Sequence, residues 1–548
     1  MISSLAYLQP EEDKGNLPKF DTAEKSNGCT ITDLRVTPNA VQNKLAGLDP
    51  NKANGPDNIP ARLLKELSKE LSLPYCLLFN KSLESGEIPL DWKKANVKAI
   101  FKKGTRSDPG NYRPVSLTSI SCKILESFIR DAIVDHMKSN KLYSQCQHGF
   151  RRHRSCITQL LEVMEDFTKL IENERNIDII YLDFKKAFDS VPHERLLIKL
   201  ESYGITGNIN LWIRDFLNNR QQKVRVSNSY SEEAKVLSGI PQGSILGPVL
   251  FTLFINDLPD NLSSTCKIFA DDTKMYNTPQ NQKDIQDDLN RLTDWSKTWK
   301  LFFNTSKCKV LHVGKSNPKY KYTMEQEGDE TEVQECTQEK DLGVVFDNKL
   351  KFDLHVQSAI NKANKMTGII KRTFSFLDIP SFMRLYKAMI RPHLEYGNII
   401  WSSSNLIRQS KAIENVQRRA TKLLPAIKDL TYEARLRALK LPSLKSRRLR
   451  GDLIQTYKII NQVDDVDTNH FFKMANMTDN KSNITRKSYQ KILHQQNLTN
   501  TRRYSFSHRV IKHWNSLPEH VKKAQNTNSF KTALDKQEMV RNTWYEFD

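Results

Sequence analysis

Three aspartates stand at the ends of two short apolar stretches. Asp183 closes the run IDIIYLD, and Asp271 and Asp272 lie between the arms CKIFA and TKMY. Burying an unpaired charge is costly, and two ionised carboxylates about 4 Å apart repel by about 1 to 4 kcal/mol at effective dielectrics of about 80 to 20. Because a divalent cation reverses that repulsion, the three acids predict a site for two Mg²⁺ ions and the chemistry of nucleotidyl transfer.

Each acid also has a simpler interpretation. An Asp-Asp pair by itself is more often a solvated turn, and Asp183 could cap a helix that begins in FKKAF. Spacing alone leaves these alternatives open. The supporting elements are clearer, because the apolar run at 177–183 predicts a buried strand, and residues 266–276 predict a hairpin with the carboxylates at its tip.

Further elements surround these two strands. Apolar spacing predicts helices at 158–171 and, from Pro192, after the first strand. Upstream we expect a helix around residues 41–48, a second helix from Pro60, and a strand in NVKAIF at 96–101 that leads into a basic hairpin.

Size and charge narrow the class of protein. A chain of 548 residues exceeds the usual size of one hydrophobic core, so we expect several lobes after an irregular lead-in at residues 1–30. The net charge of +21 indicates a polyanionic partner, and nucleic acid fits best. No uncharged apolar run approaches the roughly 18 to 20 residues of a membrane span, and no signal peptide is recognisable, so we expect an intracellular protein. The eight scattered cysteines contain no CxxC pair, which argues against structural zinc and a disulfide framework.

Basic residues concentrate in the last third of the chain. Residues 411–460 carry thirteen Lys or Arg against four Asp or Glu. Apolar residues repeat at intervals of three and four in the helix expected at 413–424, and basic residues take another face. We expect nucleic-acid phosphates to be bound there by Lys411, Arg418, Arg419 and Lys422.

Three motifs in this order carry a resemblance to a known family. YLDFKKAFDSV at 181–191, SGIPQGSILGPVLF at 238–251 and FADD at 269–272 resemble the central palm motifs of reverse transcriptases from non-LTR retrotransposons, the jockey-like branch above all. The resemblance runs from about residue 40 to the end, through NKANGPDNIP, NYRPVSLTSISCKILE, QHGFRRHRS, LFFNTSKCKVL and KDLGVVFD. Residues 502–524 are similar to the end of jockey-like polyproteins, with Trp514 expected as a packing anchor rather than a stacking platform.

The resemblance implies an α/β right-hand polymerase fold with a mostly helical C-terminal region. On this basis we expect five parts. They are a lead-in at 1–40, an N-terminal extension with the fingers at 41–160, a palm with some fingers elements at 161–335, a basic helical thumb at 336–460 and a C-terminal region at 461–548.

The resemblance also implies roles for single residues. Asp183 and Asp271 would ligate both Mg²⁺ ions, for which Mn²⁺ could substitute, with Asp272 binding less directly and the backbone carbonyl of Phe184 helping. Lys307 would either protonate the leaving pyrophosphate or contact phosphate.

A second group of residues would hold the nucleotide. Phe188 would lie under its sugar and exclude a 2′-hydroxyl, unless it is an ordinary core residue. Gln242 and Gly243 would border the nascent base pair. Arg113, with Lys102 or Lys103, would grip the triphosphate.

The function implied is RNA-directed DNA polymerisation with an RNA template, a DNA primer or target and dNTPs, in the nucleus and cytoplasm and without a membrane. We expect no endonuclease in this chain, so a separate endonuclease or an element-encoded RNA-binding protein would be a partner. The alternative is a non-catalytic RNA-binding relic of a retroelement. KSRRLR at 445–450 could be a nuclear localisation signal or a phosphate contact.

Overall fold

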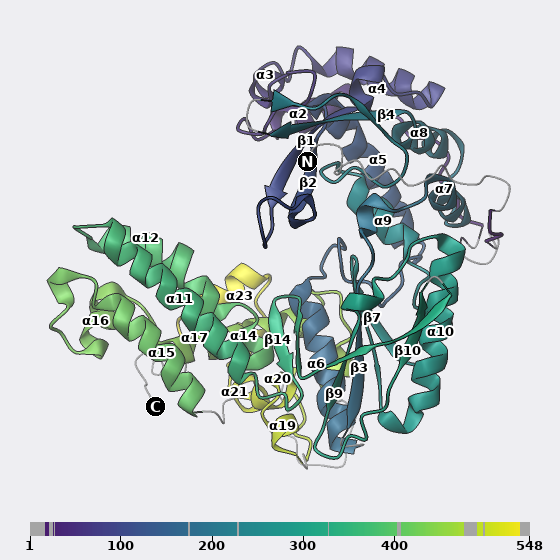
Figure 1. The fold of residues 1–548 in the computed structure, drawn as a ribbon. Coiled ribbons are helices and arrows are strands. Elements are labelled where there is room, and N and C mark those ends of the chain that lie inside the picture. Colours follow the sequence, from purple (N-terminus) through teal and green to yellow (C-terminus); the bar gives the residue numbers. More distant parts are fainter. Residues whose placement is uncertain are drawn as a thin grey trace.

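The computed structural model describes residues 17–20, 26, 28–173, 176–226, 229–326, 328–402, 407–475, 490–496 and 499–537. These residues form an N-terminal lobe, a central sheet with its covering helices, and a helical lobe followed by a C-terminal segment (Figure 1). The predicted mixed α/β class is confirmed. Most of the lead-in predicted at 1–30 lies outside the described residues.

The N-terminal lobe combines helices with a small sheet at the top of Figure 1. Its helices are α2 (Pro38–Ala46), α3 (Ala61–Glu66), α4 (Ser72–Ser85), α5 (Ile120–Ser139) and α8 (Gly207–Leu217). Its sheet has the order β2 (Tyr112–Leu117), β1 (Lys94–Phe101), β4 (Arg220–Val226) and β5 (Ser229–Tyr230), with β6 (Ala234–Val236) paired to β4. The helices expected at 41–48 and from Pro60 are α2 and α3, and the predicted basic hairpin is the antiparallel pair β1–β2.

The central sheet contains both strands that were expected to carry the acids. Its order is β12 (Gln334–Cys336), β9 (Lys309–Val313), β3 (Ile177–Leu182), β8 (Asp272–Asn277) and β7 (Thr265–Phe269). Helices α6 (Cys156–Asn173) and α10 (Gln282–Trp299) flank this sheet, whereas α7 (His193–Ser202) and α9 (Gly247–Phe254) pack on each other toward the N-terminal lobe (Figure 1). Two further hairpins are β10 (Thr323–Gln326) with β11 (Asp329–Glu332) and β13 (Gln338–Asp341) with β14 (Val344–Asp347).

Strand β3 is apolar except for the buried Asp178, because both of its faces are covered. Ile180 and Leu182 belong to the hydrophobic core shared with the N-terminal lobe. Ile177 and Ile179 belong to a second core, which continues into the helical lobe. Alternation along a strand sends successive side chains to opposite faces, so this one strand joins the two cores. The sheet is therefore a fixed platform between the lobes.

The helical lobe extends away from the sheet to the left in Figure 1. Its helices are α11 (Asp353–Thr373), α12 (Ile379–Leu385), α13 (Arg391–Glu395), α14 (Asn398–Trp401), α15 (Ile407–Thr421), α16 (Tyr432–Leu439) and α17 (Leu444–Ile460). The helix expected at 413–424 is α15, which begins earlier and ends at Thr421. Its apolar side is buried as predicted, with Ile413 3% and Val416 0% exposed.

The C-terminal segment packs against both the helical lobe and α6. It contains α18 (Thr468–Phe471), α19 (Asn500–Arg503), α20 (Phe506–Arg509), α21 (Ile511–Asn515), α22 (Glu519–Lys522) and α23 (Thr527–Leu534). Arg502 binds Glu165 of α6, and Arg509 binds Asp452 of α17 through both carboxylate oxygens. Trp514 is fully buried and donates a hydrogen bond to the carbonyl of Gln490, which confirms its expected role as a packing anchor.

In the part of the chain that the structure describes, no helix combines the length and apolar character needed to cross a bilayer.

Candidate active site

The three predicted acids meet where β3 ends and the β7–β8 hairpin turns. Strand β3 runs antiparallel to β8, and Leu182 is paired with Thr273. The next positions along this register are Asp183 and Asp272. Ala270 and Asp271 form the hairpin tip, with Ala270 in the left-handed region at φ +55°. The sequence prediction of carboxylates at a hairpin tip beside the first strand end is confirmed by this register.

The hairpin tip is held by a loop that precedes α6. The buried side chain of Gln147 accepts hydrogen bonds through Oε1 from the backbone N–H of Gly149 (2.7 Å) and of Ala270 (3.1 Å). The backbone N–H of His148 donates to the carbonyl of Ile268 at 2.8 Å, which adds this loop to the edge of β7. The residue directly before Asp271 is therefore fixed by a side chain more than a hundred positions earlier.

The acids repel one another in this arrangement. Burial raises the pKa of Asp271, and the charge of Asp183 raises it further. Burial, then the charges of Asp271 and Asp341, raises the pKa of Asp272 to about 6. Nearby cations oppose these effects, and for Asp271 they are Arg113 and Lys102. Carboxylates with raised pKa values close to one another form a donor set that a divalent cation would stabilise.

Lys307 also lies beside the acids. It comes just before β9, the strand that pairs with β3 on the side opposite to β8. Its Nζ lies 3.0 Å from Oδ2 of Asp183, and the backbone N–H of Asn304 donates to the Asp183 carbonyl at 2.7 Å. Phe184 stacks on Phe303 with ring centroids 4.5 Å apart. Among the described residues, no group of three His, Cys, Asp or Glu side chains is arranged closely enough to hold a metal ion. Asp183 is instead paired with the Lys307 ammonium, while the oxygen chemistry of the three acids still suits a hard divalent ion.

The loop at 238–243 is pressed against the β3–α7 connection and against β2. Gly239 (φ +82°) and Gly243 (φ +122°) adopt conformations that L side chains rarely take. A Cβ atom at Gly239 would lie 2.5 Å from the carbonyl oxygen of Asp189, and one at Gly243 would lie 2.5 Å from that of Ser116. The backbone N–H of Ser116 donates to the carbonyl of Gln242 at 2.7 Å. Both glycines are therefore required by close backbone approach.

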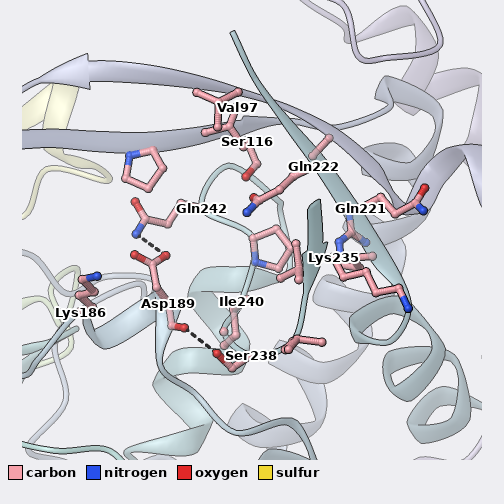
Figure 2. A pocket seen from close by; sticks show the side chains of 18 of the residues that line it. Val97, Ser116, Lys186, Asp189, Gln221, Gln222, Lys235, Ser238, Ile240 and Gln242 are labelled. Atoms are coloured by element: carbon pink, nitrogen blue, oxygen red, sulfur yellow. Dashed lines mark hydrogen bonds between the residues drawn. The ribbon is translucent and has the colours of Figure 1, made fainter. Parts of the chain in front are cut away.

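A cavity of about 120 Å³ lies between this loop and the sheet of the N-terminal lobe. Figure 2 shows the side chains that line it. Gln242 points from the loop toward Asp189, and its Nε2 donates to Asp189 Oδ1 at 3.0 Å. Ser116 of β2 lies above the pair, and Lys235 of β6 lies across the cavity. Burial raises the pKa of the Asp189 carboxyl, while the bond from Gln242 lowers it.

Phe188 lies next to this loop. Its ring stacks on Phe251 of α9 with centroids 4.4 Å apart, and its carbonyl accepts from the N–H of Ile240 at 2.8 Å. The side chain is half-buried. One face of the ring thus packs on the core. This arrangement is compatible with a ring that lies under the nucleotide sugar and with an ordinary core residue.

The β1–β2 hairpin supplies the cations. Lys102 and Arg113 are both exposed, and both act electrostatically on Asp189 and on Asp271. Lys103 is exposed and is not among the main charges acting on these two carboxyls. Lys102 is therefore among the main charges acting on these two carboxyls, and the choice between Lys102 and Lys103 as a triphosphate ligand stays a prediction.

The basic residues of the helical lobe are exposed as the amphipathic pattern requires: Lys411, Arg418, Arg419 and Lys422. Arg418 lies over the ring of Tyr432 at 4.9 Å, and Arg419 donates to Asn364 of α11 at 3.1 Å. These contacts hold the Arg418 guanidinium against α16 and the Arg419 guanidinium against α11.

Comparison with known proteins assigns the central region. Residues 100–346 match the family model described as reverse transcriptase (RNA-dependent DNA polymerase). This chain carries a reverse transcriptase domain. All of the acids, the glycine loop and the β1–β2 hairpin tip discussed above lie within the matched residues, whereas α11 to α23 lie beyond them. The palm fold expected from the resemblance is therefore confirmed for the reverse transcriptase domain.

The relatives found among characterised proteins come from non-LTR elements. The chain is 28% identical over 417 residues to the probable RNA-directed DNA polymerase from transposon X-element of Drosophila melanogaster, covering 72% of this chain and 45% of the relative. It is 28% identical over 380 residues to the RNA-directed DNA polymerase from mobile element jockey of the same species, covering 66% and 41%. The chain thus spans less than half the length of these relatives. The predicted resemblance to jockey-like reverse transcriptases is confirmed.

Two residues at this site were missed from the sequence. Asp189 lies in the motif YLDFKKAFDSV, six positions after Asp183, and Gln147 is the first residue of QHGFRRHRS. The sequence assigned no role to either residue. Both motifs contain several other polar residues, so the sequence offers no signal that singles out these two or names their partners. The partners Gln242 and Ala270 lie 53 and 123 positions away.

Proposed function

We propose that this chain is an RNA-directed DNA polymerase that extends a DNA primer on an RNA template with dNTPs. The observation that carries the proposal is the meeting of Asp183 with the Asp271–Asp272 tip, opposite the exposed cations Lys102 and Arg113. Acids on one side and cations on the other suit a reaction in which a polyphosphate must be both held and cleaved.

In the proposed reaction the primer 3′-hydroxyl loses its proton to solvent, and its oxygen forms a bond to the α-phosphorus of the dNTP. The bond between the α-phosphorus and the oxygen that bridges to the β-phosphate breaks, so pyrophosphate leaves. Arg113 and Lys102 would bind the triphosphate and withdraw charge from it. Lys307, already beside Asp183, would donate a proton to the departing pyrophosphate or bind its oxygens. Phe188 would contact the sugar of the nucleotide, and Gln242 and Gly243 would contact the nascent base pair.

Reverse transcriptases as a family use divalent metal ions. Asp183 and Asp271 would hold two Mg²⁺ ions, or Mn²⁺ in their place, with help from Asp272 and the Phe184 carbonyl. The ions would lower the pKa of the primer hydroxyl and neutralise charge on the phosphates. The raised pKa values of Asp271 and Asp272 support this assignment, because a bound divalent ion would offset the repulsion among these carboxylates.

The remaining proposals concern partners and organisation. The five-part division predicted from the sequence would make α11–α17 a thumb whose exposed basic residues Lys411, Arg418, Arg419 and Lys422 grip the template–primer duplex by its phosphates. Cleavage of a DNA target would require an endonuclease activity, which a separate protein could supply. Such a polymerase would act with its RNA in the nucleus and cytoplasm.

Primer extension tests the central proposal. The purified chain is given poly(rA)/oligo(dT), dTTP and Mg²⁺, alongside Asp271→Ala and the matched variant Asp91→Ala, which removes an exposed carboxylate of the N-terminal lobe. We expect extension by the wild type and by Asp91→Ala, and loss of at least a hundredfold in Asp271→Ala. EDTA should abolish extension, and added Mg²⁺ should restore it.

The alternative, a non-catalytic RNA-binding relic, draws support from the exposed basic face of α15 alone. It predicts RNA binding by the wild type and by Asp271→Ala with no extension by either. A folded wild-type chain that binds RNA but extends no primer on several templates, with Mg²⁺ or Mn²⁺, would replace the first proposal with the second.

A further inference from the structure

The hydrogen bond between Asp189 and Gln242 joins two segments that both border the proposed nucleotide site. Asp189 lies in the connection between β3 and α7, directly after Phe188, and Gln242 lies in the glycine loop. The backbone ties between the same segments are the bonds from Ile240 N–H to the Phe188 carbonyl and from Gly239 N–H to the Val191 carbonyl. The loop backbone is thus fixed independently of the Asp189 carboxylate.

The side chain of Gln242 is not fixed by those backbone bonds. It has three rotatable bonds before the amide, and it borders the cavity of about 120 Å³ shown in Figure 2. This cavity has room for the terminal amide to turn away from its observed position. Among the residues that the structure describes, Asp189 is the hydrogen-bond partner of the Gln242 side chain, and this bond opposes such a turn.

The chemistry of the pair also sets which end of the amide is presented. An ionised carboxylate accepts hydrogen bonds and donates none, so it must bind the NH₂ end of the amide. The carbonyl Oε1 of Gln242 and its second N–H are then left for another partner. The observed geometry, with Nε2 at 3.0 Å from Asp189 Oδ1, agrees with this requirement.

We propose that Asp189 is a positioning residue that holds the Gln242 amide in one orientation toward the incoming nucleotide. Asp189 itself does not touch the nucleotide in this proposal, and its effect passes through Gln242. The inference rests on the proposed function, because it assumes that Gln242 contacts the nucleotide during polymerisation. Removing the carboxylate should therefore weaken nucleotide binding and leave the fold intact.

A double-mutant cycle tests this inference by primer extension with dTTP as the varied substrate. The variants are Asp189→Ala, Gln242→Ala and the double variant, with Asp91→Ala as the matched acid-to-alanine control. We expect KM for dTTP to rise roughly tenfold in Asp189→Ala, with kcat changed less than threefold. The reason is that the hydrogen bond that orients the Gln242 amide is lost, and one such bond contributes about as much as a tenfold change in affinity. In the Gln242→Ala background the further change should be less than twofold, since Asp189 then has nothing to position.

Asp189→Asn separates the hydrogen bond from the charge. Asparagine keeps an oxygen that accepts from Gln242 Nε2, so KM should return to within threefold of the wild type. If Asp189 acted by its charge on Lys102 and Arg113 instead, the asparagine variant would resemble the alanine variant, and the inference would be wrong.

The outcomes distinguish this inference from the proposed function. An active wild type whose Asp189 and Gln242 effects simply multiply would overturn the positioning role and leave the polymerase proposal standing. A folded wild type with no extension would overturn both. Thermal unfolding of each variant is measured in parallel, and a loss of folded protein in Asp189→Ala alone, with normal folding in Asp189→Asn, would assign Asp189 a structural role and contradict the proposal.

Discussion

The buried ion pair between Arg502 and Glu165 offers a quantitative test of the fold. The side chains are 4% and 3% exposed, and Arg502 Nη2 lies 2.7 Å from Glu165 Oε1. Ser507 donates to the other carboxylate oxygen at 2.6 Å. The substitution Arg502→Met keeps most of the apolar volume but removes the guanidinium. Glu165 then remains buried with Ser507 and a more distant Lys169 ammonium at 3.4 Å.

Breaking a buried pair by removing one partner costs about 3 to 5 kcal/mol, and the remaining Lys169 places the expected loss near the lower end, about 3 kcal/mol. A cooperative unit of this size has an unfolding entropy on the order of 1 kcal/mol/K, so the unfolding temperature should fall by about 3 °C. Scanning calorimetry and urea unfolding measure the two quantities. Removing both charges in Arg502→Met with Glu165→Gln should recover part of the loss, because no charge is then buried alone.

Arg437→Met is the matched control. Arg437 pairs with Glu433 on the surface of α16, where the side chains are 64% and 45% exposed. An exposed pair contributes about 0 to 1 kcal/mol, so this variant should unfold within about 0.5 kcal/mol of the wild type. The reasoning about Arg502 would be refuted if Arg502→Met were no less stable than the control. It would also be refuted if the double variant were less stable than Arg502→Met.

Three further predictions concern the active site, acid stability and nucleic-acid binding. Gly243→Ala places a Cβ 2.5 Å from the Ser116 carbonyl oxygen, so the loop backbone must move. Primer extension should fall at least tenfold while the circular dichroism spectrum stays unchanged. Full activity would show that the loop tolerates this backbone movement. Burial lowers the pKa of the His148 imidazole from 6.5 to about 4. Between these pH values the unfolded state binds more protons than the folded state, so the free energy of unfolding should fall by up to roughly 3 kcal/mol as the pH drops from 6.5 through 4. His148→Gln should flatten that dependence, and an unchanged slope would contradict the assignment. Lys422→Ala and Arg418→Ala should each weaken binding to RNA/DNA duplexes of any sequence. The slope of log affinity against log salt concentration should become smaller by about 0.7 to 0.9 for each lost phosphate contact. An unchanged slope would show that these residues do not belong to the proposed interface.

The sequence by itself determined the local elements and the identity of the acids. The mostly apolar run before Asp183, interrupted by Asp178 alone, predicts a strand covered on both faces, and β3 is that strand. The two short apolar arms around Asp271 and Asp272 require a hairpin, and β7–β8 is that hairpin. These patterns are readable because strand and hairpin periodicity depends on residues close together in the chain. The ordered motifs then assigned the family, which the matched residues 100–346 confirm.

Only the tertiary structure decided which side chains meet. Lys102 is among the main charges acting on Asp271 because of where the β1–β2 hairpin lies, which no local spacing encodes. The Asp189–Gln242 bond spans 53 positions and the Arg502–Glu165 bond spans 337. Hydrogen bonds and ion pairs act over about 3 Å, so a partner is specified by the packing of whole elements. The two cores joined through β3 set that packing.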